Sequence, residues 1–131
     1  MKLNISEALA KLSIVFFVIS LALPVTCCSF GGQDVYGYLA LLMGWIGMTS
    51  IGGLPWIANI LILISWITFH VKKDYRLSLV LAGISSLLAL YGVFIHKYDD
   101  PLLVGVYFWL LSIVLALVGF IVATVLSRKR V

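Results

Sequence analysis

The longest uncharged stretch of this 131-residue chain runs from Val35 to Phe69, 35 residues without Asp, Glu, Lys, Arg or His. A helix that crosses a membrane needs about 20 apolar residues, so two crossings joined by a turn need about 40 or more. The stretch is therefore too long for one straight span and too short for two. Whether this stretch crosses the membrane once or twice decides the topology of the whole chain.

Composition places the chain in a membrane. Hydrophobic residues make up 63% of it and charged residues only 11%, too few to keep a domain of this size in solution. Three further apolar runs accompany the central stretch: Leu12 to Thr26, Leu77 to Ile95 and Leu102 to Leu126. No Lys/Arg patch with interleaved aromatics lies outside these runs, and this argues against a nucleic-acid partner.

The distribution of basic residues favours a single crossing between residues 35 and 70. With one crossing, only Lys97 of the 9 basic residues lies on the opposite side from the others. With two crossings, the "KKDYR" loop and the "SRKR" tail are separated by the membrane. Because Lys and Arg in short loops prefer the cytoplasmic side, we predict one crossing, with both termini cytoplasmic.

These arguments predict an all-α membrane protein with one domain over residues 1–131. Its four transmembrane helices are expected at about 9–27, 54–70, 77–95 and 102–126. Residues 38–51 are expected not to cross, and to form a short re-entrant or interfacial helix before the second span. Gly52 and Gly53 are a candidate hinge, and Pro55 suits the first turn of the next helix.

Polar and small residues inside the spans are the candidate functional positions. Asn59 lies about one turn into the second span, where a polar group in lipid needs a partner, commonly on another helix. Small residues at four-residue spacing in the last two spans allow helix backbones to approach closely. The candidates for helix packing or for lining a pore are Asn59, Ser86, Ser112, Ala116 and Gly119.

No catalytic, cofactor or metal site is predicted. The sequence has no Cys-x-x-Cys motif and no phosphate-binding loop. Cys27 and Cys28 are adjacent, and their role, as small apolar fillers or as a redox pair, stays open. His70 and His96 fall at opposite faces of the membrane, so they cannot share a metal within one subunit. We therefore expect no enzymatic activity and no cofactor.

The segment Gly37 to Trp66 combines a Gly-Trp pair, a "WIAN" helix start and a following basic loop, and "YFWLLS" occurs later in the chain. In these features it resembles uncharacterised small four-helix bacterial inner-membrane proteins. The resemblance implies a bacterial inner-membrane location, and it carries no activity with it.

These features together predict a small non-enzymatic membrane protein that acts through helix packing. It would be an accessory subunit of a larger membrane-protein partner or a component of a homo-oligomer, surrounded by membrane lipid. Two alternatives stay open. One is a homo-oligomeric pore or holin-like effector, with Asn59 and the small-residue stripes lining a channel. The other is a small transporter.

Overall fold

Four long helices dominate the computed structural model, which describes residues 2–30, 33–47, 53–96 and 102–128. Each is long and apolar enough to cross a membrane. The chain therefore has the features of a multi-pass membrane protein, as predicted. The four helices are α1 (Lys2–Ala22), α3 (Leu54–Ile67, extended by the π turn η3, Thr68–Lys72), α4 (Tyr75–His96) and α5 (Val104–Arg128).

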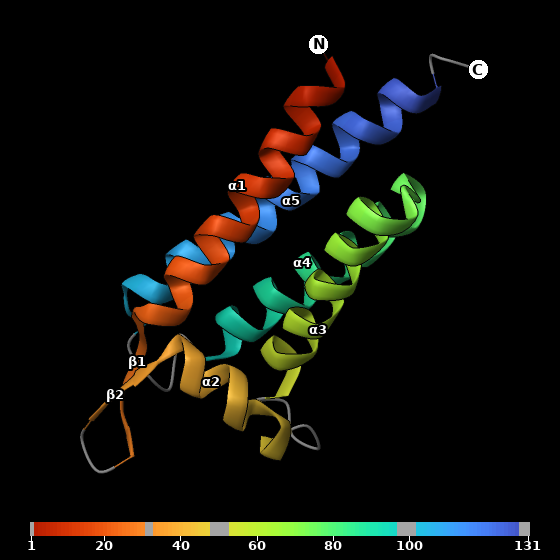
Figure 1. Cartoon of the computed structure of the whole chain (residues 1–131). Helices are drawn as coiled ribbons and strands as arrows, with labels where there is room; N and C mark the ends of the chain where they lie inside the picture. Colours follow the sequence, from red (N-terminus) through yellow and green to blue (C-terminus); the bar gives the residue numbers. More distant parts are fainter. Residues whose placement is uncertain (1, 31–32, 48–52, 97–101, 129–131) are drawn as a thin grey trace.

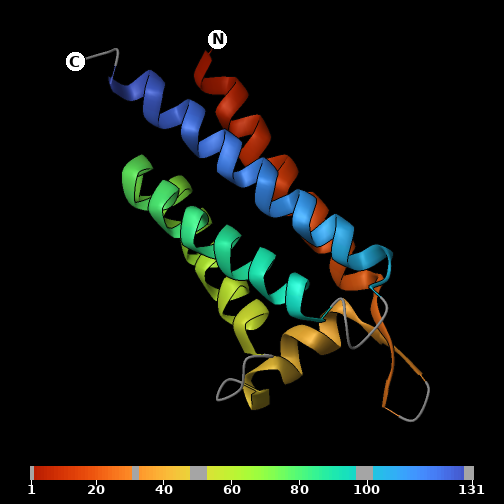
Figure 2. The same ribbon diagram turned by 180° about the vertical axis from the view of Figure 1, so that it is seen from behind.

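The helices form two antiparallel pairs, α1 with α5 and α3 with α4 (Figure 1). The start of α1, the end of α5 and the turn between α3 and α4 lie at one end of the bundle. The view from behind shows the same two pairs, with α2 at the opposite end (Figure 2). Both ends of the chain therefore lie on the side that carries the basic turn.

A two-stranded hairpin follows α1, and the sequence analysis did not predict it. Strand β1 (Pro24–Phe30) pairs antiparallel with β2 (Gln33–Tyr36), and the amide N–H of Leu103 donates to the carbonyl oxygen of Val25 at 3.0 Å. Proline disfavours helical backbone in the residue before it, so α1 ends ahead of Pro24. The first helix thus runs from Lys2 to Ala22 instead of the predicted 9–27.

Helix α2 (Gly37–Met43) and the 3-10 turn η1 (Gly44–Gly47) occupy part of the predicted non-crossing segment. Seven helical residues span about 10 Å, far less than the hydrocarbon core. Of the described residues between 37 and 72, only 54–72 form a helix that is long enough to cross. The described residues therefore offer one helix, and not two, that could cross the membrane in this region. Whether α2 is re-entrant or interfacial remains a prediction.

The turn between the second and third long helices contains an unusual backbone. Lys73 has a φ of 55° and a ψ of 24°, the left-handed conformation, and its N–H donates to the carbonyl of Thr68. The next residue, Asp74, caps α4, because its side-chain oxygen accepts the N–H of Leu77 at 3.0 Å. A two-residue link therefore suffices to reverse the chain.

Candidate functional site: the interior of the bundle

Three of the four long helices, α1, α4 and α5, bury mostly small residues at alternating spacings of three and four, with Phe17 as the large exception. In α1 the buried series is Ser6, Ala10, Ser13, Phe17 and Ser20; in α4 it is Ser78, Ala82, Ser85 and Ala89; in α5 it is Ser112, Ala116, Gly119 and Ala123. This spacing repeats every seven residues, the period of a left-handed coiled coil. Small side chains along that seam let the backbones within each pair approach closely.

Three of the predicted packing residues lie in this seam on α5. Ser112 and Ala116 are fully buried, and Gly119 faces the backbone of α1. A methyl group added at Gly119 would lie 3.1 Å from the Cβ atom of Leu9 and 3.2 Å from the carbonyl oxygen of Ser6. Gly119 is therefore a contact point between α1 and α5.

Ser86, the fourth small candidate, lies beside the seam of α4. It is half-buried, and its hydroxyl donates to the carbonyl of Ala82 in its own helix at 2.7 Å. Its neighbour Ser85 is fully buried and donates across to the carbonyl of Ala58 in α3 at 2.8 Å. Ser85, and not Ser86, belongs to the three-and-four series of α4, and a packing or pore-lining role for Ser86 stays a prediction.

Asn59 joins two helices, as expected for a polar group in a span. Its side-chain oxygen accepts a hydrogen bond from the indole N–H of Trp109 at 2.6 Å, which connects α3 to α5. This contact uses the carbonyl group of Asn59 within the monomer. It agrees with the packing interpretation of Asn59, while a role in lining a pore has no contact to support it here.

Three tryptophans connect different parts of the bundle through their indole N–H groups. Trp66 donates to the hydroxyl of Ser13 at 3.1 Å, and Trp56 donates to the carbonyl of Leu41 at 2.8 Å. With Trp109, each of these indole N–H groups bonds a different element from its own. A helical span in lipid has no free backbone acceptors, so a buried indole must find a partner elsewhere.

Large aromatic residues on α3 and its extension η3 lie between the two helix pairs. Trp66 packs edge-on against Phe17 of α1, with ring centroids 5.2 Å apart, and Phe69 packs on Phe120 of α5 at 4.7 Å. Small residues therefore hold helices together within a pair, while aromatic rings fill the space between pairs.

The predicted hinge is only partly visible. Gly52 lies outside the described residues. Gly53 has a φ of −80° and a ψ of −11°, values that other residues also adopt, so its backbone conformation does not require glycine. Pro55 lies in the first turn of α3 as predicted, and its ring packs where Gly92 of α4 has no side chain. Close packing of Pro55 against Gly92 is the role that the described residues of this corner show.

Charged groups gather at the end of the bundle that carries the termini. The Lys73 ammonium nitrogen lies 3.7 Å from a carboxylate oxygen of Glu7, an ion pair that joins the α3–α4 turn to α1. Among the described side chains, the one buried polar atom without a hydrogen-bond partner is Nε2 of His70. The side chains of Cys27, Cys28 and His96 lie outside the description. Within the described ranges, no cluster of three His, Cys, Asp or Glu side chains could hold a metal ion.

Comparisons with protein-family models, with curated proteins and with solved structures find no match to this chain.

Proposed function

We propose that this chain is a non-enzymatic component of a larger membrane assembly, an accessory subunit or one copy in a homo-oligomer. The interior supports this proposal because its polar groups bond one another. The side-chain oxygen of Asn59 accepts a hydrogen bond from Trp109, and the hydroxyl of Ser85 donates one to the backbone of α3. Side chains engaged in this way hold helices together, and they are poorly placed to bind a substrate or line a water path.

The observation that carries the proposal is that specific contacts fix α2 against the rest of the bundle. Its first residue, Gly37, donates to the carbonyl of Leu23 at 3.0 Å, and Leu41 accepts the Trp56 indole N–H at 2.8 Å. Gly44, just after α2, packs against the ring of Trp56. A seven-residue helix is unstable alone, so these contacts hold it in place.

Helix α2 and the turn η1 expose apolar side chains that the rest of the bundle does not cover. Exposed residues of α2 and η1 include Leu42, Met43 and Ile46, and Leu42 is 65% exposed. A rigid apolar face at the end of a bundle, beside and not within the spans, suits contact with a partner membrane protein or a second copy. Location in the bacterial inner membrane with cytoplasmic termini is part of the proposal, supported by the basic residues at the terminal end.

Photo-crosslinking from α2 tests this proposal. A photoreactive phenylalanine analogue at Leu42 should give a discrete protein adduct in cells, either a dimer or a larger partner that also co-purifies in stoichiometric amount in mild detergent. The matched control is Val80, which is 56% exposed on α4. There we expect mainly lipid adducts.

Two results would count against the proposal. Lipid adducts alone at both positions would mean that α2 simply lies in the lipid interface. A purified homo-oligomer that makes liposomes leak ions, with leakage changed by Asn59→Leu, would instead favour the pore.

A further inference from the structure

Lysine side chains flank the contact between the start of α1 and the turn that ends α3. Glu7 and Lys11 are four residues apart in α1 and so lie on one face, and Lys73 reaches Glu7 from the turn. His70 lies three residues before Lys73 in the same turn, and its Nε2 atom is buried. We call this contact, formed by Glu7, Lys11, His70 and Lys73, the α1–turn seam.

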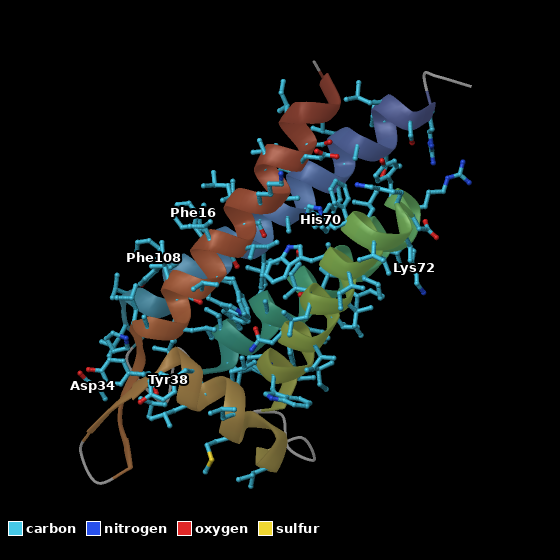
Figure 3. All side chains as sticks on the ribbon, in the orientation of Figure 1. Phe16, Asp34, Tyr38, His70, Lys72 and Phe108 are labelled. Atoms are coloured by element: carbon cyan, nitrogen blue, oxygen red, sulfur yellow. The ribbon has the colours of Figure 1, made fainter. Side chains whose placement is uncertain are left out.

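Figure 3 shows how two residues of the turn differ in direction. His70 lies on the side of the turn that faces α1, while Lys72 points away from it (Figure 3). Lys72 is therefore not part of the seam.

The seam carries one excess positive charge. It holds two lysines against one carboxylate, and Glu7 is already paired with Lys73. Lys11 is exposed and makes no ion pair in the described part of the chain. It also lies within the apolar span that begins at Ile5, where an unpaired cation is costly.

Lys73 stands where a helix usually ends in glycine. Its left-handed backbone conformation is unfavourable for a residue with a side chain, and a glycine would adopt it freely. Its side chain is turned toward α1 and Glu7. A strained lysine in place of glycine is consistent with a use for its charge.

The surface below Lys11 is apolar. Val15 and Val18 follow Lys11 at four and seven residues along the same face of α1, and both are exposed. A cation above an apolar helix face is complementary to a phosphodiester with acyl chains below it. A soluble anion would gain nothing from the valines, and it would have to enter the apolar layer to reach Lys11.

We propose that the α1–turn seam binds the headgroup of an acidic phospholipid, with Lys11 and Lys73 contacting its phosphate and the valine face of α1 contacting an acyl chain. One negative charge on the phosphodiester matches the excess positive charge of the seam. Glu7 competes with the phosphate for Lys73.

The test measures thermal unfolding of the detergent-purified protein with added phosphatidylglycerol, with phosphatidylcholine of the same acyl chains, and with inorganic phosphate. We expect phosphatidylglycerol alone to raise the melting temperature. Lys11→Gln should raise the lipid concentration for half-maximal stabilisation by about fivefold. Glu7→Gln should lower that concentration, even though it removes an ion pair.

Arg128→Gln is the matched control, because Arg128 is an exposed basic residue at the same end but on α5. It should leave the lipid response unchanged. Lys73→Gly serves as a second seam variant that keeps the turn conformation, and it should weaken the response as Lys11→Gln does. Equal losses in Lys11→Gln and Arg128→Gln would overturn the proposal in favour of a diffuse basic surface. An equal gain from phosphatidylcholine or from phosphate would overturn it as well.

Discussion

Replacing Gly119 with leucine should destabilise the bundle strongly, whereas the same change at Gly83 should not. Even a methyl group at Gly119 would meet Leu9 at 3.1 Å and the backbone oxygen of Ser6 at 3.2 Å. Backbone atoms in a close-packed helix pair cannot move aside cheaply. Overpacking of this kind costs about 1–3 kcal/mol, and a whole leucine side chain belongs at the upper end of that range.

Gly83 provides the matched control, since a Cβ atom added there meets no atom within 4 Å. Leucine is also the better helix former, so Gly83→Leu should leave stability equal or raise it slightly. The measurement is the fraction folded against temperature in detergent, with both variants prepared in parallel. If Gly119→Leu and Gly83→Leu have the same melting temperature, α1 and α5 do not pack through the seam of small residues.

Truncating Trp66 to alanine should be the most damaging single deletion in the space between the helix pairs. The indole is buried, packs on Phe17 with a centroid distance of 5.2 Å, and donates to Ser13 at 3.1 Å. Large-to-alanine changes in protein cores cost about 3–5 kcal/mol for aromatic residues. In lipid the transfer from water is absent, so lost packing dominates and we expect about 2 kcal/mol.

Ser13→Ala separates packing from hydrogen bonding. It removes the acceptor and keeps the ring in place, and a hydrogen bond between helices in lipid is worth about 0.6 kcal/mol on average. Denaturant titration of both variants in mixed micelles should therefore show a clearly larger loss for Trp66→Ala. Equal losses would mean that the indole N–H, and not the ring, holds α3 to α1.

The long helices were predictable because their signals are additive over many residues. Apolar length predicted four long helices, and the structure has four that could span a membrane. The asymmetry of Lys and Arg predicts a single crossing around Thr49 to Trp66, and that crossing stays a prediction. The end of the first span was not found, because the apolar composition continues past Ala22 while the backbone changes at Pro24. A proline-based rule for helix ends would have placed that boundary correctly.

The interior contacts were harder to predict. Asn59 was recognised as a residue that needs a partner. The sequence around it does not indicate that the partner is Trp109, which lies 50 residues away. Ser85 and Ser86 are adjacent and chemically identical, so only the three-and-four spacing along the helix distinguishes them. The Lys73 ion pair with Glu7 depends on the turn geometry and could not be derived from spacing.

A single crossing between the hairpin and the basic turn would fix the topology of the whole chain. Cysteine accessibility measures it directly, in a background where Cys27 and Cys28 are replaced by serine. One cysteine replaces Asp34 in β2 and another, in a separate variant, replaces Asp74 in the α3–α4 turn; both positions are exposed. A membrane-impermeant thiol reagent applied to intact cells should label residue 34 and should reach residue 74 only after the membrane is opened. Labelling of residue 74 from outside, or of both positions from the same side, would contradict the account.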